Sequence, residues 1–278
     1  MVRITIRVRV CSMLKNIKRY LRLYGQFVSF SFGKAAAYRF DFWCRILMDI
    51  AYYAVAIGFF KILFLTTATL GGWTQEQIMV FVGANLVLDA VQMTVISGNI
   101  WELPSTINKG NLDNYLTKPV STLFFLCFHE VAVGSIVNLL IAVGFFWWAL
   151  LSYTVAFSIW QFLSFIIFLS VGFFIYFAMR LIVALPVFWT QTPYGLERIF
   201  YSMIPLMERP DLIFRGPLRI LILTIIPFGL VVSFPARIFF DGLTLSIALH
   251  MIVVLAIMWS IVFWIWNKGV KDYASASS

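Results

Sequence analysis

The sequence predicts an all-α polytopic membrane protein. Of its 278 residues, 62% are hydrophobic and only 12% are charged, and the mean hydropathy is +0.93. A soluble domain is about 45–50% apolar and about 25% charged, so a soluble fold of this length would leave much apolar surface in water. The apolar runs are continuous and long enough for membrane helices of about 20 residues, whereas barrel strands alternate over about 10 residues.

Basic residues concentrate near the N-terminus. The net charge is +9, and ten of the 21 Lys and Arg residues precede residue 46. By the positive-inside rule, this bias places the N-terminus in the cytoplasm. Basic side chains beside a span also meet anionic lipid, so the charge indicates a membrane partner and not a nucleic acid.

Residues 14–28 predict an amphipathic helix at the membrane surface. Apolar side chains recur at steps of three and four and form one stripe, which consists of Leu14, Ile17, Leu21, Tyr24 and Val28. Basic side chains gather on another side, namely Lys15, Lys18, Arg19 and Arg22. Such a helix lies in the interface of the inner leaflet with its basic face toward the headgroups. The alternative is a surface helix on a soluble domain, but no soluble domain follows in the sequence.

Five apolar runs predict membrane spans in chain order. They are residues 42–66, 78–100, a span within 123–153, 159–179 ending at Arg180, and 247–266. The third run is long enough for an interfacial helix followed by a span, and His129 and Glu130 mark its inner part.

The region between residues 182 and 241 allows two arrangements, each with six spans and both termini inside. In the first, residues 182–205 form the fifth span, and the proline-broken residues 206–241 dip into the outer leaflet without crossing it. In the second, residues 182–205 lie at the inner surface and residues 220–240 cross the membrane. The positive-inside rule favours the second, because it keeps the arginines between these two segments inside. The residues alone leave both arrangements open.

A polar stretch, residues 101–121, separates the second and third spans on the cytoplasmic side. Gly110 permits a turn, and Pro119 ends the segment and sets the direction in which the third span begins. From the residues alone, the stretch is equally a solvated loop with one helical turn or a short helix that a partner protein grips.

Charged residues within spans cost about 2.5–3.5 kcal/mol each at the centre and therefore generally face the bundle interior. The predicted spans contain Asp49, Asp89, Gln92, Glu197 and Arg198. These residues form either a polar route or subunit contact for a substrate, or ion pairs that lock the bundle. The structural interpretation is favoured for Asp49, and the transport interpretation for Asp89 with Gln92.

No enzymatic constellation is visible in the sequence. The Gly-x-x-x-x-Gly-Lys-Ser/Thr loop that holds ATP phosphates is absent. The three cysteines lack the spacing of a disulfide framework or a metal site, and the two histidines, His129 and His250, lie in different spans. We therefore expect no catalytic residue and no metal or cofactor bound by this chain. ATP hydrolysis that drives transport would occur on a separate subunit.

Three separated segments resemble the membrane subunits of ABC-2 type ABC transporters, in particular a subgroup of uncharacterised bacterial permeases. AYRFDFW (37–43) places a Tyr-Arg pair at the end of the basic helix. INKGNLDNYLTKPVS (107–121) resembles the subgroup's Gly-x-Leu-Asp…Leu-x-x-Pro pattern, with Lys118 where Arg is expected. The segment 210–242 is similar in the order of its prolines. Together with the apolar layout, the resemblance covers nearly the whole chain after residue 13.

The resemblance implies an N-terminal interfacial helix, six spans, and a re-entrant segment between spans five and six on the outer side, which favours the first arrangement. It divides the chain into a cytoplasmic N-terminal part (1–41), an ABC-2 type transmembrane domain (42–267) and a cytoplasmic tail (268–278). It also implies a location in the bacterial cytoplasmic membrane with both termini in the cytoplasm.

The resemblance further implies a permease subunit of an exporter, paired with a second permease that is identical or related. A separate cytoplasmic ATPase, which carries ATP and Mg, would grip the 101–121 loop as a coupling helix. The candidate coupling residues are Trp101, Glu102, Leu103, Ile107, Gly110, Leu112, Asp113, Lys118 and Pro119. The alternatives are a secondary carrier or an integral-membrane enzyme. A carrier often shows an internal repeat, and none is convincing here.

Overall fold

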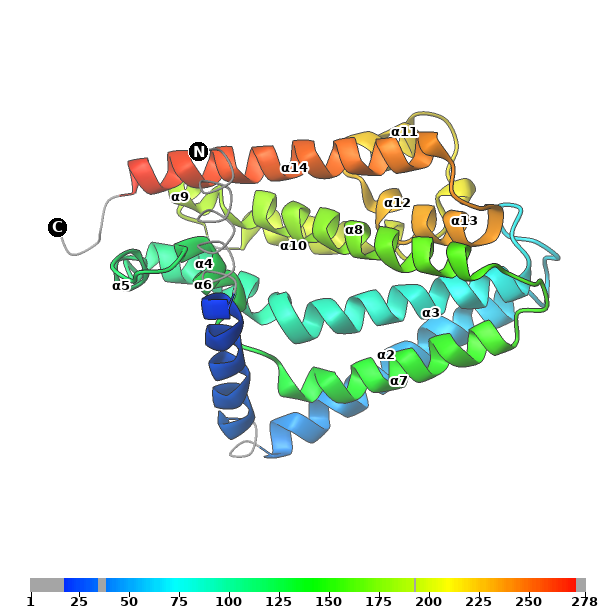
Figure 1. Cartoon of the computed structure of the whole chain (residues 1–278), viewed down its shortest axis with the longest axis horizontal. Coiled ribbons are helices and arrows are strands. Elements are labelled where there is room, and N and C mark those ends of the chain that lie inside the picture. The colour runs from blue at the N-terminus through cyan, green and yellow to red at the C-terminus, as the bar shows by residue number, and fades with distance from the viewer. Residues whose placement is uncertain (1–17, 35–38, 193, 274–278) are drawn as a thin grey trace, which may run out of the picture.

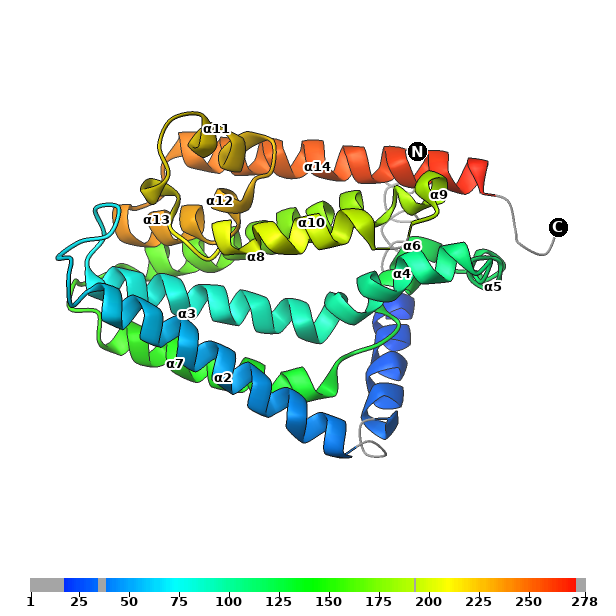
Figure 2. The same ribbon diagram turned by 180° about the vertical axis from the view of Figure 1, so that it is seen from behind.

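The computed structural model describes residues 18–34, 39–192 and 194–273. In these residues the regular elements are helices, apart from an isolated bridge between Leu70 and Trp73. Figures 1 and 2 show long helices side by side in a bundle, with the helix of residues 18–34 crossing one end. The predicted all-α polytopic class is confirmed. Leu14, Lys15 and Ile17 of the predicted interfacial helix lie outside the described residues.

Five helices in the described part of the chain are long and apolar enough to cross a membrane. They match the predicted spans one to four and the last span. Their bounds are α2 (Arg39–Leu63), α3 (Gln75–Gln92) with its continuation to Asn108, α7 (Val133–Leu151), α8 (Ile159–Ala184) and α14 (Leu245–Asp272). Thr74 and Ser158 begin α3 and α8 with capping boxes. In each box the cap hydroxyl accepts from the backbone N–H of the Gln three residues later, and the side-chain oxygen of that Gln accepts from the backbone N–H of the cap residue.

Helix α3 forms the centre of the bundle. In its most apolar stretch 72% of the residues are buried, against 17% in α2 and 22% in α14. The close packing of α3 on α7 depends on Gly83, where a Cβ atom would lie 2.9 Å from the Cα of Phe146. Helices α2 and α14 instead turn most of their apolar side chains outward, as helices in contact with lipid or another membrane subunit do.

The two ends of the bundle carry different short helices. The α5 end carries α4 (Gly98–Asn108), α5 (Asp113–Leu116), α6 (Thr122–Phe128) and α9 (Val187–Thr190). The α13 end carries the loop 64–74, α11 (Gly216–Thr224), α12 (Phe228–Val231) and α13 (Ser233–Asp241). The predicted interfacial helix before span three is α6, and residues 129–132 separate it from α7.

The helix of residues 18–34 packs against α6 through aromatic side chains. The ring of Tyr20 meets Phe124 edge-on at 4.8 Å, and the ring of Phe27 meets Phe125 at 4.9 Å. Lys18, Arg19 and Arg22 are exposed, as a basic outer face requires. The rings of Tyr20 and Phe27 make the contact with α6, whereas Leu21 of the predicted stripe is 66% exposed; the contact of the stripe with lipid stays a prediction.

The predicted fifth span is not a continuous helix. Helix α8 extends to Ala184, Pro186 and the left-handed Gln191 (φ 53°) interrupt the chain around α9, and α10 (Gly195–Met203) has only nine residues. A 3₁₀ turn, η2 (Ile204–Leu206), follows. Proline has no N–H to donate within a helix, so the helix breaks there. Residues 182–205 are apolar enough for a span, but their backbone does not form one continuous helix.

The broken segment nevertheless passes from one end of the bundle to the other. At the α5 end, the Asn108 side-chain amide donates to the Gln191 carbonyl at 2.8 Å. At the α13 end, a Cβ on Gly71 would lie 3.0 Å from the Cβ of Leu212. Residues 216–241 then fold as three short helices at the α13 end (Figure 2), so they do not form the single span of the second arrangement. The number of spans and the re-entrant character of residues 206–241 stay predictions.

Candidate functional site

The polar stretch 101–121 begins inside a helix. Helix α3 passes through a π-helical turn, η1 (Met93–Ser97), into α4, and the three together form one 34-residue helix. This helix continues past the predicted end of the second span because Leu103 and Ile107, four residues apart, extend its buried face. Gly110 (φ 74°) then turns the chain into α5.

Three of the predicted coupling side chains are buried within this chain. Leu103, Ile107 and Leu112 are at most 4% exposed and belong to the hydrophobic core. Helix α4 turns this face toward α6, α8 and α9. The prediction that these three side chains fill a groove on a partner is therefore corrected, since they already fill the space between elements of the same chain.

The remaining predicted coupling residues lie at or near the surface. Trp101 and Glu102 are exposed on α4, and Asp113 is half-buried. Lys118 does not pair with Asp113 among the described contacts, because its ammonium lies 3.9 Å above the centre of the Phe125 ring. The Pro119 carbonyl accepts a hydrogen bond of 2.6 Å from Arg19.

Helix α5 and the residues beside it, 109–118, form the tip of this end of the bundle. The sequence interpretation did not single out Leu116, an apolar residue of this tip. Leu116 ends α5, is 39% exposed and stands among exposed polar residues, namely Asn114, Thr117 and Lys118. An apolar side chain in a polar, projecting turn is the kind of anchor that a groove on another protein binds. No signal in the sequence separates Leu116 from Leu112, which is buried.

Polar contacts tie the helix of residues 18–34 to the segment between residues 119 and 131. The Ser121 N–H donates to the Tyr20 hydroxyl at 3.0 Å, and the Val131 N–H donates to Ser31 Oγ at 3.0 Å. Lys34 forms an ion pair of 2.8 Å with Glu130. These contacts run along the helix, so it and α6 form one unit at the α5 end.

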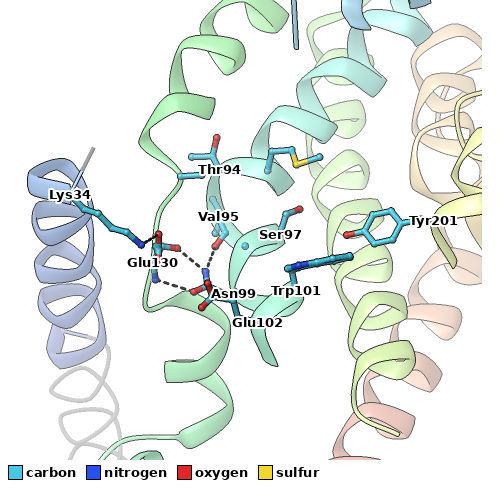
Figure 3. A pocket seen from close by; sticks show the side chains of 12 residues that line it. Lys34, Thr94, Val95, Ser97, Asn99, Trp101, Glu102, Glu130 and Tyr201 are labelled. Carbon is cyan, nitrogen blue, oxygen red and sulfur yellow. Dashed lines mark hydrogen bonds and ion pairs between the residues drawn. The ribbon is translucent and has the colours of Figure 1, made fainter. Parts of the chain in front are cut away.

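A cavity of about 390 Å³ opens beside α4, between this unit and α10 (Figure 3). Its walls include Lys34, Asn99, Trp101, Glu102, Glu130 and Tyr201. The Asn99 amide donates to the Glu130 carbonyl at 2.7 Å, and its oxygen accepts from the Glu130 N–H at 3.0 Å. Asn99 thereby fixes the backbone from which the Glu130 carboxylate points into the cavity.

Three potential metal ligands meet at the same place. Glu102, His129 and Glu130 each offer one ligand atom, and these three atoms lie within 4.8 Å of one another. The Lys34 ammonium already binds Glu130 there. His250, by contrast, sits far along the chain and lies 3.0 Å from the Leu223 carbonyl through Nε2. The expectation that this chain binds no metal stays a prediction.

The comparison with protein families gives one match. A family model described as ABC-2 family transporter protein matches residues 50–277. The chain belongs to this ABC-2 family. Neither a curated protein nor a solved structure matches the chain.

Membership in the ABC-2 family makes the chain a membrane permease subunit of an ABC transporter. Such permeases are generally not enzymes, and membership implies an ATP-binding partner subunit. The matched residues include all five long apolar helices except the first turns of α2. The resemblance predicted from the three sequence segments is confirmed.

The interior of this ABC-2 permease contains several of the predicted polar residues. The Asn138 side-chain amide donates to the Asp49 carboxylate, which joins α7 to α2. Asp89 lies close enough to Asp49 and Glu208 to interact with both electrostatically. Gln92 is buried, and its amide nitrogen has no hydrogen-bond partner among the described residues.

Helices α8 and α10 of the permease contribute a second polar group. Glu197 is 2% exposed, and neither carboxylate oxygen has a described hydrogen-bond partner, whereas Arg198 beside it is exposed. Arg180, interpreted from sequence as the end of the fourth span, is instead 2% exposed. Its guanidinium lies 4.9 Å from the centre of the Tyr201 ring. Hydropathy alone marks an arginine as a boundary, so its burial could not be predicted.

Proposed function

We propose that this ABC-2 permease is the membrane subunit of an ATP-driven exporter, and that a separate cytoplasmic ATPase binds its α5 end. The observation that carries the proposal is the continuity of α3 with α4. One helix of 34 residues joins the centre of the bundle to the projecting tip. Because this helix is continuous as far as Asn108, a displacement at its Asn108 end would be passed along it to the most buried helix.

Charge placement supports the cytoplasmic side for the α5 end. The described basic residues at this end include Lys18, Arg19, Arg22, Lys109, Lys118, Lys268 and Lys271. The positive-inside rule then places the α5 end, and with it both termini, in the cytoplasm of a bacterial cell. The α13 end and its short re-entrant helices face outward.

The ATPase partner would contact the exposed part of the tip. Leu116 is its apolar anchor, and Asn114, Thr117 and Lys118 surround that anchor. The unit of α6 and the helix of residues 18–34 would move with the tip, because Arg19 and Tyr20 bind residues 119–121 directly. ATP and Mg bind the partner, and a second permease, identical or related, completes the transport pathway.

The experiment that tests this proposal is co-purification of the tagged permease with a cytoplasmic ATPase of its native cells that carries the phosphate-binding loop. We expect the tagged permease to retain the ATPase, and Leu116→Asp to lose it. The matched control is Leu243→Asp, because Leu243 is 51% exposed at the α13 end. A wild-type permease that never retains an ATPase, or equal retention by both variants, would contradict the proposal.

A further inference from the structure

The cavity beside α4 carries an excess of negative charge. The charged residues that line it are Glu102, Glu130 and Lys34. Lys34 compensates Glu130 through the 2.8 Å ion pair. Glu102 has no hydrogen bond or ion pair with the described residues. The cavity wall therefore offers one carboxylate that is free to meet a positive charge.

An aromatic shelf faces the same cavity. The Trp101 ring stacks on Tyr194 with centroids 5.0 Å apart and an angle of 22°, and its centroid lies 5.8 Å from that of Tyr201. Trp101 is still 45% exposed, so one part of the indole remains available. In Figure 3 Trp101 and Tyr201 extend toward each other across the opening. Indole faces attract cations and also cover apolar surface.

The size and support of the cavity suit an organic molecule. Its volume of about 390 Å³ falls within the range of about 300–1,000 Å³ typical of small-molecule sites. Asn99 holds the Glu130 backbone through two hydrogen bonds, so the carboxylate wall is preorganised. Met93 lines the cavity, and an unbranched thioether adapts to irregular apolar shapes.

A bare metal ion fits the observations less well. Glu102, His129 and Glu130 offer ligand atoms within 4.8 Å of one another. However, the Lys34 ammonium already occupies Glu130, and a metal ion would leave the aromatic shelf and most of the cavity unused. Asp89 is a further carboxylate near the cavity in sequence: it lies on α3, four residues before Met93 and nearer the centre of the bundle.

We propose that this cavity binds a lipophilic organic cation. Glu102 meets the positive charge, the Trp101 face covers the apolar body, and Met93 and Tyr201 close the inner wall. Under the proposed function, the cavity lies at the cytoplasmic mouth of the pathway, and the bound cation is the substrate class for export. That last step rests on the proposed function, whereas the binding itself does not.

The test measures binding without an ATPase, so its outcome is independent of the co-purification experiment. The full chain is placed in phosphatidylcholine nanodiscs and dialysed to equilibrium against radiolabelled tetraphenylphosphonium, with empty discs subtracted. Tetraphenylborate, which has the same shape and the opposite charge, is the ligand control. We expect saturable binding of tetraphenylphosphonium at one site and no saturable binding of tetraphenylborate.

Variants locate the site. Glu102→Gln and Trp101→Ala should each weaken tetraphenylphosphonium binding about tenfold, the size expected of a partly desolvated cation contact. The matched controls are Asp241→Asn and Trp160→Ala, because both residues are exposed at the α13 end.

Elution of each variant as a monodisperse species verifies folding. Equal binding of the two probes, or full binding by both cavity variants, would overturn the proposal. Zn²⁺ binding that depends on His129 and excludes tetraphenylphosphonium would replace it with a metal site.

Discussion

The side chain of Asn99 binds the backbone of Glu130 on both sides, donating to its carbonyl at 2.7 Å and accepting from its N–H at 3.0 Å. Asn99 is 3% exposed and belongs to α4, whereas Glu130 lies in the break between α6 and α7. One buried amide thus satisfies a stretch of chain that has no helical partners of its own.

Removing this amide should destabilise the α5 end. Asn99→Ala leaves the part-buried N–H and carbonyl of Glu130 without their partner, at up to about 1–3 kcal/mol for each group. We expect a clearly lower midpoint of thermal unfolding in detergent than for the wild type. The exposed Asn111→Ala is the matched control and should unfold like the wild type. An unchanged midpoint for Asn99→Ala would show that the pair carries no stability.

Gly172 sets the distance between α8 and α12. A Cβ at this position would lie 2.0 Å from the Val231 carbonyl oxygen, and backbone atoms cannot move aside as a side chain does. Gly172→Ala should therefore destabilise the bundle by at least about 1–3 kcal/mol, despite the better helix propensity of alanine. Gly144→Ala in α7, where nothing lies within 4 Å, should be neutral or slightly stabilising. Thermal unfolding of the two variants in parallel tests this difference, and a stable Gly172→Ala would refute the close approach.

Asp211 holds the α13 end together. Its fully buried carboxylate accepts a hydrogen bond from Ser233 Oγ at 2.6 Å and pairs with Arg219 at 3.0 Å and Arg237 at 3.6 Å. Asp211→Asn removes the negative charge that Arg219 and Arg237 share. Breaking a fully buried pair costs about 3–5 kcal/mol, and the 37% and 24% exposure of the two arginine side chains lowers the cost here. Hydrogen exchange should rise in α11 and α13 and stay unchanged in α4. The exposed Asp241→Asn should leave both regions unaffected; uniform protection in both variants would count against this role.

Cys127 should resist thiol reagents. It lies in α6, is 1% exposed, and burial raises the pKa of its thiol well above the ordinary value. The reactive species is the thiolate, so both low access and a raised pKa slow the reaction at pH 8. In a Cys11→Ser, Cys44→Ser background, maleimide labelling should be detected by mass only after unfolding. Leu116→Cys in the same background should label at once, and equally fast labelling of Cys127 would contradict the burial of α6.

Most of the helical layout could be predicted from the sequence. Long apolar runs, a basic N-terminal segment and a polar interruption are local properties, and each span satisfies its own backbone hydrogen bonds. The fifth span could not be predicted in the same way. Residues 182–205 have a suitable composition, but Pro186 and the left-handed Gln191 divide them into short helices.

The candidate site could be predicted only in part. The polar stretch 101–121 marked this end of the bundle, and Trp101 and Glu102 are exposed there, so their contact with an ATPase stays a prediction. Leu103, Ile107 and Leu112 were assigned to a partner, although they pack inside the chain. An apolar side chain in a polar stretch fits an external groove or an internal core equally well, so only the contacts of α4 decide between them.

The sequence by itself determined that this is a helical membrane protein, where its long helices lie and where its basic residues concentrate, because hydropathy and charge are properties of single residues and short runs. The permease function followed from the segments that resemble ABC-2 transporters and from the family match. The tertiary structure alone decided which helix is central, because lipid tails are as apolar as leucine and hydropathy does not distinguish a face toward lipid from a face toward protein. It also decided which distant groups meet. Glu102 and Glu130 come together, and Asp211 reaches Arg219 and Arg237, only because α4, α6, α11 and α13 pack as they do.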